Sequence, residues 1–261
     1  MINSRTTFEF KQYTSTGIEL ISTNIAIESP VSLTVNGKIW LTFQCTPEDL
    51  EQLAVGFLFN EGFVRKFEEI ASIHVCDQKD NVDIWLYHEA VKPETWRRTS
   101  GCHGGATTID LDQDKIEPVL DPSPLHIDQL LQLIIFFLDN QPPHSETGGV
   151  HTSAIADGDK ILFYQDDIGR HNTIDKIAGR LLMEGITPKL PIILTTGRVS
   201  SDMMQKAIRL RTPYVISMRS TSSDSIRLAD DWGITLLCGA RKIRVNAYTH
   251  PERIILDHND E

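Results

Sequence analysis

Apolar and polar residues alternate through VSLTVNGKIWLTF, residues 31–43, and Asn36-Gly37 interrupts the alternation. A period of two is the pattern of a strand with one buried face. Asn-Gly suits the two central positions of a type I′ turn, which joins neighbouring antiparallel strands. This stretch therefore predicts a β-hairpin.

Residues 46–62, TPEDLEQLAVGFLFNEG, change to a period near 3.6, which predicts an amphipathic helix. Thr46 can cap this helix, Pro47 fits its first position, and Gly62 fits its end. SIHVC and VDIWLY follow as two further strands. We expect residues 1–117 to form an α+β domain.

The pattern changes after PVLDPSPLHID, residues 118–128, whose prolines indicate a linker. We expect helices over 127–139 and 171–184, with a strand pair around Asp157-Gly158 between them. The apolar strands PIILTT, PYVISM and ITLLC then alternate with the helices SDMMQKAIRL and SDSIRLADDW. This alternation predicts a parallel sheet with right-handed crossovers. The fold class is therefore α/β, with an α+β domain over 1–117 followed by an α/β domain over 118–261.

Composition narrows the class of partner. The 261 residues are 40% hydrophobic and 23% charged, with a formal net charge of −11. These values are typical of a globular protein, and the negative net charge argues against nucleic acid or an anionic membrane as a partner. No apolar run approaches the roughly 18 residues of a membrane span. Because MINSRTTFEFKQ also lacks a secretory apolar region, we expect a cytoplasmic protein.

The four cysteines lie far apart. No CxxC pair and no HxxxH spacing occurs, so zinc or another tightly bound metal is not expected. In a reducing compartment the thiols stay free. Cys45, Cys76 and Cys238 lie in or beside apolar strands, and we interpret them as small core residues.

Cys102 has different neighbours, in RRTSGCHGGATT, residues 97–108. Its glycines permit close backbone approach and loop mobility. Positive charge on Arg97, Arg98 or His103 would lower the pKa of the thiol. An accessible thiol on such a loop can carry a group between two partners. The alternative is a loop cysteine without a chemical role.

Basic residues follow three of the expected strands. Arg198 follows PIILTT, Arg219 follows PYVISM, and GARKIR, residues 239–244, follows ITLLC. Ligands of open α/β sheets bind at the carboxyl ends of the strands, and arginines near helix N-termini suit phosphate groups. These residues predict a focused anion pocket. The alternative is a set of solubilising loop arginines.

Two histidines are further candidates. His171, in DDIGRHNTIDK, has carboxylates nearby. It could act as a general base or proton shuttle, or the stretch could form a helix cap and a solvated turn. His151, in GGVHTSA, is either a site residue or a core histidine, and the core interpretation is favoured.

The order of the motifs resembles a known family. A glycine-flanked SGC, then GGVHTSA, DDIGRHNTIDK, TTGRVSSDMMQKA and AYTHPERI follow one another along nearly the whole chain. On these residues the chain resembles the FdhD/NarQ family, the sulfur carrier (sulfurtransferase) proteins that formate dehydrogenase requires for activity. The resemblance implies a cytidine-deaminase-like, three-layer α/β fold for the C-terminal domain. The zinc signature of that superfamily is missing after His151.

The resemblance also implies a reaction. Such proteins take sulfur from a cysteine desulfurase as a cysteine persulfide. They transfer it to the molybdenum cofactor, bis-molybdopterin guanine dinucleotide, which they bind as a substrate before its insertion into formate dehydrogenase. The family's persulfide cysteine falls on Cys102, which would be the catalytic residue of a sulfurtransferase. The cofactor-binding stretch falls on Gly239, Ala240, Arg241, Lys242, Ile243 and Arg244.

Two departures keep an alternative open. Some members carry a second cysteine three positions after the first, where this chain has Gly105, and the basic stretch lacks the proline-glycine of some relatives. The alternative is a non-covalent chaperone that presents the molybdenum cofactor to formate dehydrogenase. Missing zinc ligands disfavour a nucleoside deaminase. Exposed apolar surface on the hairpin or on helix 127–139 would support a homodimer.

Overall fold

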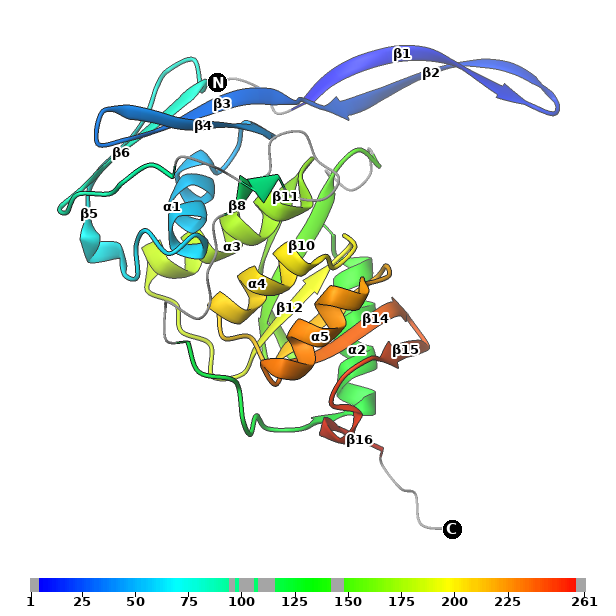
Figure 1. Cartoon of the computed structure of the whole chain (residues 1–261). Coiled ribbons are helices and arrows are strands. Elements are labelled where there is room, and N and C mark those ends of the chain that lie inside the picture. Colours follow the sequence, from blue (N-terminus) through cyan, green and yellow to red (C-terminus); the bar gives the residue numbers. More distant parts are fainter. Residues whose placement is uncertain (1–4, 94–96, 99–105, 108–115, 142–147, 257–261) are drawn as a thin grey trace, which may run out of the picture.

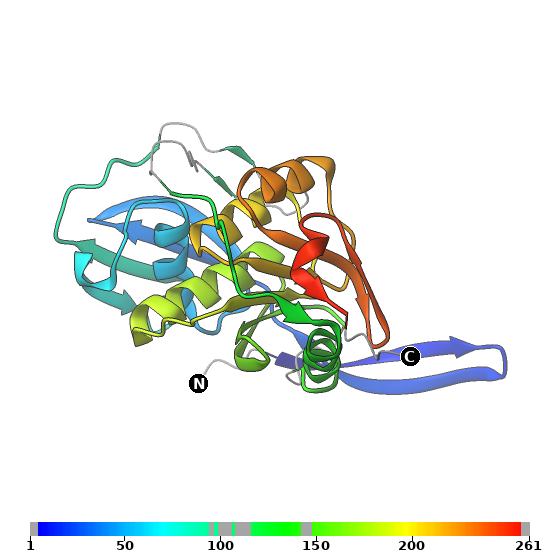
Figure 2. The ribbon, with the colours of Figure 1, turned by 90° about the horizontal axis from the view of Figure 1, so that it is seen from below.

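The computed structural model describes residues 5–93, 97–98, 106–107, 116–141 and 148–256. The chain starts with a long antiparallel hairpin, β1 (Arg5–Thr14) and β2 (Gly17–Ala26). This arm projects from the body of the molecule (Figures 1 and 2). Phe8 is 52% exposed and Tyr13 73%, so the arm carries unburied apolar surface. This arm is separate from the hairpin of residues 31–43 and from helix 127–139, on which the homodimer was expected, and the homodimer stays a prediction.

The N-terminal unit is a four-stranded sheet with one helix on it. The strand order is β4-β3-β6-β5, from β3 (Ser29–Val35), β4 (Lys38–Cys45), β5 (Ile70–Val75) and β6 (Asn81–Leu86). The predicted hairpin is confirmed, since β3 pairs with β4 and both Asn36 and Gly37 have positive φ. Helix α1 (Leu50–Asn60) buries its apolar side on this sheet, and the short 3-10 helix η1 (Phe67–Glu69) follows.

The predicted start of this helix is wrong. Helix α1 begins at Leu50, after Asp49 in the left-handed conformation, φ 51°. Thr46 does not cap the helix, because the N-cap position is Asp49, three residues later; the Thr46 backbone N–H donates to the Asp167 carboxylate. Residues 46–49 therefore connect β4 to α1, and the end near Gly62 is as predicted.

The second unit is a six-stranded sheet in the order β11-β10-β12-β13-β14-β15. Its strands are β10 (His151–Asp157), β11 (Lys160–Asp167), β12 (Pro191–Thr195), β13 (Tyr214–Ser217), β14 (Thr235–Arg241) and β15 (Arg244–Ala247). β12, β13 and β14 are parallel, as predicted, whereas β10 runs antiparallel to β12 and β15 to β14.

Helices cover both faces of this sheet. α2 (Ile127–Asp139) packs on one face, and α3 (Arg170–Glu184), α4 (Ser201–Arg209) and α5 (Ser223–Asp231) pack on the other (Figures 1 and 2). The four helices coincide with the predicted ones within one or two residues. The mixed α/β class and the three-layer arrangement are thus confirmed.

The two units meet where α1 crosses α3. A Cβ on Gly56 would lie 1.7 Å from the Asp175 carbonyl oxygen, and one on Gly179 would lie 1.9 Å from that of Gln52. Only glycine at both positions permits this approach. Leu182 and Met183 of α3 also pack against the N-terminal core. The division at residue 117 stays a prediction.

The expected linker also contacts the body of the protein. Val119 N–H donates to the Trp232 carbonyl, and Tyr214 Oη donates to that of Ser123. Within the same stretch β9 (Leu125–His126) pairs with β16 (Ile254–Ile255), which follows the 3-10 helix η3 (Pro251–Arg253). Residues 118–126 are therefore packed chain rather than a free linker.

Candidate functional site

Five segments reach one edge of the six-stranded sheet. Thr195 at the end of β12 is level with Ser217 of β13, which is level with Cys238 of β14. Antiparallel pairing brings the start of β10, at His151, to the same edge. β11 also ends there, at Asp167, and α3 begins three residues later. The predicted convergence of strand ends is confirmed.

Three arginines act on His151 at this edge. Burial lowers the pKa of the half-buried His151, and the positive charges of Arg170, Arg219 and Arg198 lower it further, in that order. These charges come from the start of α3 and from the loops after β13 and β12. We call His151, Arg170, Arg198 and Arg219 the cationic edge. His151 is half-buried and lies beside these charges, so it is not a fully buried core histidine.

Hydrogen bonds fix the loops that carry these arginines. Ser217 Oγ donates to the Gly197 carbonyl at 2.7 Å and accepts from Arg219 N–H at 2.9 Å. The Arg219 carbonyl in turn accepts from Gly239 N–H at 2.8 Å. A Cβ on Gly197 would lie 3.0 Å from the Cβ of Arg170, so glycine leaves room for that side chain. The loops after β12 and β13 are therefore held in one arrangement against the C-terminal part of β14.

His171 lies directly behind the cationic edge and is buried. Burial lowers its pKa well below the usual value, and the charges of Arg170 and Lys206 add to that effect. Its Nε2 lies 3.5 Å from Ser200 Oγ and 4.0 Å from Asp202 Oδ2. Within the part of the chain that the structure describes, Nδ1 has no hydrogen-bond partner. The His171 ring is therefore neutral, because burial and the nearby positive charges oppose its protonation.

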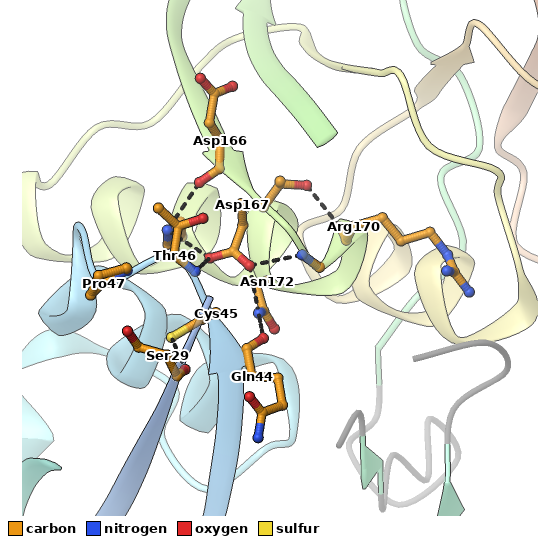
Figure 3. A network of polar contacts seen from close by, with 12 residues as sticks. Ser29, Gln44, Cys45, Thr46, Pro47, Asp166, Asp167, Arg170 and Asn172 are labelled. Carbon is orange, nitrogen blue, oxygen red and sulfur yellow. Dashed lines mark hydrogen bonds and ion pairs between the residues drawn. The ribbon is translucent and has the colours of Figure 1, made fainter. Parts of the chain in front are cut away.

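The carboxylates near His171 have a structural role. Asp167 accepts hydrogen bonds from Gly169 N–H, Asn172 Nδ2 and Thr46 N–H, and it pairs with Lys176 Nζ at 2.8 Å. Figure 3 shows this network, with the Arg170 side chain extending away from it. Neither Asp167 nor Lys176 is exposed, so the solvated turn, one of the two alternatives for this stretch, does not form there. Asp167 instead links the N-terminal unit to α3.

A second buried ion pair holds α1, α3 and α4 together. Lys206 Nζ donates to both oxygens of Asp175, at 2.6 and 2.8 Å, and Asn60 Nδ2 donates to the same carboxylate. Burial raises the pKa of Asp175, and the charge of Lys206 opposes that rise. Sequence reasoning did not find Lys206, because a lysine in an amphipathic helix is normally exposed.

The stretch GARKIR forms a hairpin between β14 and β15. Gly239 has φ 66° and binds the Arg219 carbonyl, which places it beside the cationic edge. The Arg241 guanidinium donates to the Met218 and Ala240 carbonyls, and Lys242 pairs with Asp139 of α2 at 2.5 Å. Ala240 is buried, whereas Ile243 and Arg244 are exposed. Arg241 therefore extends the positive surface next to Arg219, while Lys242 faces α2. Cofactor binding by Gly239, Ala240, Arg241, Lys242, Ile243 and Arg244 stays a prediction.

Cys102 and His103 lie outside the described residues. The chain on either side of them forms the two-stranded pair β7 (Arg97–Arg98) and β8 (Ala106–Thr107).

Cys45 and Cys238 are buried as predicted, and burial raises the pKa of each thiol to about 12. Cys76 is not a core residue, since it is half-buried in the turn after β5 and donates to Asp80 Oδ1 at 2.8 Å. Neither buried thiol forms a thiolate readily at neutral pH.

Over residues 5–93, 97–98, 106–107, 116–141 and 148–256, no group of three His, Cys, Asp or Glu side chains could hold a metal ion. In the same ranges, no helix is long and apolar enough to cross a lipid bilayer.

The fold and the site define a mixed α/β protein with a cationic edge at the ends of its parallel strands. Residues 26–255 match the FdhD/NarQ family model, and the chain belongs to this family. It is 32% identical to the sulfur carrier protein FdhD of Bacillus subtilis over 93% of this chain and 95% of that one. It is also 32% identical to the protein of the same name from Staphylococcus haemolyticus, over 87% and 88%.

A solved structure has the same fold. It is the crystal structure of a putative formate dehydrogenase accessory protein from Desulfotalea psychrophila, with a TM-score of 0.81 and 28% identity. The match covers 97% of this chain and 100% of that one. The similarity therefore extends over both units of the molecule.

Proposed function

We propose that this chain is a sulfur carrier in the maturation of formate dehydrogenase. In this proposal Cys102 takes sulfur from a cysteine desulfurase and transfers it to the molybdenum cofactor, bis-molybdopterin guanine dinucleotide. The names of the relatives support the sulfur-carrier role, and the similarity to a formate dehydrogenase accessory protein supports the link to that enzyme. The observation that carries the ligand assignment is the convergence of Arg170, Arg198 and Arg219 on His151.

The cationic edge suits a ligand rich in phosphate. Guanine dinucleotide arms carry pyrophosphates, and guanidinium groups bind phosphate oxygens in a fixed, often bidentate geometry. The N-termini of α3, α4 and α5 end at the same edge as the strands and add partial positive charge. Arg241 contributes charge next to Arg219, through its contact with the Met218 carbonyl.

The sulfur transfer has two steps. The Cys102 thiolate attacks the outer sulfur of the donor persulfide, so a new S–S bond forms, the old one breaks, and the donor cysteine leaves as a thiolate. The outer sulfur of the Cys102 persulfide then bonds to the metal of the substrate, and Cys102 leaves as a thiolate. That sulfur gains two electrons as it becomes a sulfide ligand, and the reduced metal of the substrate supplies them. A positive field would stabilise both the persulfide anion and the thiolate.

Mass spectrometry after incubation with a cysteine desulfurase and cysteine tests the first step. We expect one added sulfur on the Cys102 peptide, removable by a reductant, and none on the peptides of Cys45, Cys76 or Cys238. The Cys102→Ala protein should still bind GDP, a probe for the guanine nucleotide arm, but should not activate formate dehydrogenase.

The chaperone alternative predicts different results. Under it, Cys102→Ala would leave formate dehydrogenase activation intact, whereas Arg241→Ala or Arg244→Ala would abolish it. Full activation with Cys102→Ala would therefore reject persulfide chemistry and leave the cationic edge as the functional centre.

A further inference from the structure

A groove of about 550 Å3 lies at the opposite edge of the six-stranded sheet. Its lining includes the C-terminal ends of α3 and α4, the start of β12, and residues of α1 and η1. The cationic edge lies at the other end of α3. At about 1.5 Å per residue, this helix separates the two places by roughly 20 Å. The groove is therefore distinct from the proposed sulfur-transfer site (α3 in Figure 1).

The inner lining of the groove is apolar. Ile155 and Ala178 are fully buried beneath it. Partly buried apolar side chains form its walls: Phe59, Phe67, Leu181, Leu182, Ile186 and Leu210. Such a lining favours the apolar body of a ligand, because contact removes apolar surface of both from water.

The rim of the groove is basic. Lys66, Lys189, Arg209 and Arg211 line it, and Glu68 is the acidic residue among its lining. The chain as a whole carries a formal net charge of −11, so this local excess of positive charge runs against the average. Lys189 and Arg211 are exposed and form no ion pair with another described residue. The ammonium group of Lys189 and the guanidinium group of Arg211 are thus available to bind an anion.

Thr212 adds an independent observation. It lines the groove and is 0% exposed, yet its hydroxyl has no hydrogen-bond partner among the residues that the structure describes. A buried hydroxyl without a partner is unfavourable for the folded state. A ligand oxygen that accepted a hydrogen bond from Thr212 would remove that penalty.

From these features we infer that the groove is a binding site for a small amphipathic anion, an apolar body with a carboxylate or phosphate group. The apolar body packs on Leu181 and Leu210, and the anionic group lies between Lys189 and Arg211, within reach of Thr212. The inference goes beyond the proposed function and does not depend on it, because no step of sulfur transfer uses these residues.

Calorimetry on the full chain with decanoate tests the inference. We expect saturable binding with one site per chain and a rise in Tm. Decyltrimethylammonium has an apolar chain only one carbon longer and the opposite charge, and it should bind at least about tenfold more weakly. Absence of decanoate binding, or equal binding of the two compounds, would overturn the inference.

Two double variants test the location of the site. Lys189→Glu combined with Arg211→Asn should weaken decanoate binding about tenfold or more, and asparagine tolerates the left-handed backbone of Arg211, φ 52°. Lys11→Glu with Lys38→Asn makes the same change in net charge on the arm and on β4, and it should leave binding unchanged. Equal weakening by both pairs would mean that net charge alone matters, and the site would be rejected.

Thr212→Val separates the role of the hydroxyl from a role in folding. Without ligand, this variant should have an unchanged or higher Tm, because an unpaired buried hydroxyl is replaced by a methyl group. With decanoate, its rise in Tm should be smaller than that of the parent protein. An undiminished rise would show that Thr212 does not contact the anion and would remove it from the site.

Discussion

Lys176 Nζ lies 2.8 Å from Asp167 Oδ2, and neither side chain is exposed to solvent. Lys176 also donates to the Asp166 carbonyl, while Asp167 accepts from the backbone N–H of Thr46. The pair therefore joins the end of β11, the first turns of α3 and the chain between β4 and α1. Because α3 begins with Arg170, these contacts also position the backbone of Arg170 at the cationic edge.

Replacement of Lys176 by methionine should strongly destabilise the protein. The change leaves the Asp167 charge buried without its cation, and loss of one partner of such a pair costs about 3–5 kcal/mol. Urea unfolding measures the free energy of unfolding. The control is Lys38→Met, at an exposed lysine, where we expect a change within about 0.5 kcal/mol. A similar small change for Lys176→Met would show that the pair does not hold α3 in place.

Replacement of Arg219 by glutamine should raise the pKa of His151. The positive charge of Arg219 is one of the causes that lower this pKa, after burial and Arg170. Histidine NMR titration measures the shift, and the chain has nine histidines, so a His151→Gln spectrum identifies the signal. Arg227→Gln, an exposed arginine on α5, should leave the His151 pKa unchanged. An unchanged pKa in Arg219→Gln would mean that Arg219 does not act on His151.

Local signals in the sequence predicted most of the elements. Asn36-Gly37 marks its turn because only certain residues adopt positive φ easily, and Gly62 marks a helix end for the same reason. The cationic edge was predictable through Arg198 and Arg219, because parallel strands place their following loops at one edge. Arg170 could have been added from the same signal, since it also follows a strand and opens a helix.

Long-range contacts account for what the sequence did not reveal. Asp167 and Asp175 look like solvated helix-cap residues, and their burial depends on Lys176 and Lys206, which only the fold brings to them. Thr46 has the side chain of a helix cap, but Asp49 holds the N-cap position, and the Thr46 N–H donates to Asp167, 121 residues away. Arg241 is the last residue of β14, not a residue after the expected strand end at Cys238, and carbonyl groups of Met218 and Ala240 hold its guanidinium.

Replacement of Gly179 by alanine should destabilise the contact between the two units. The new Cβ would lie 1.9 Å from the Gln52 carbonyl oxygen, so α1 and α3 would have to move apart. Overpacking of this kind costs about 3 kcal/mol or more when backbone opposes it. Urea unfolding measures the loss, with Glu184→Ala on an exposed position of the same helix as control. An unchanged midpoint for Gly179→Ala would mean that the two helices do not need this close approach.

The stability of the protein should fall as the pH drops below about 6.5, partly because of His171. The pKa of this histidine lies well below its usual 6.5 in the folded protein, owing first to burial. In the unfolded chain the ring binds a proton near pH 6.5, so acidification favours the unfolded state until the lower folded pKa is reached. One such group removes about 1.4 kcal/mol between about pH 7.5 and about pH 5.5.

The variant His171→Asn isolates this contribution. Urea unfolding at both pH values should give a free-energy difference about 1.4 kcal/mol smaller for the variant than for the parent protein. The comparison holds even if the variant is less stable at both pH values, because only the dependence on pH is used. If both proteins lose the same free energy on acidification, His171 takes up its proton equally in the folded and unfolded chains. It would then not be the neutral, buried ring that lies behind the arginines.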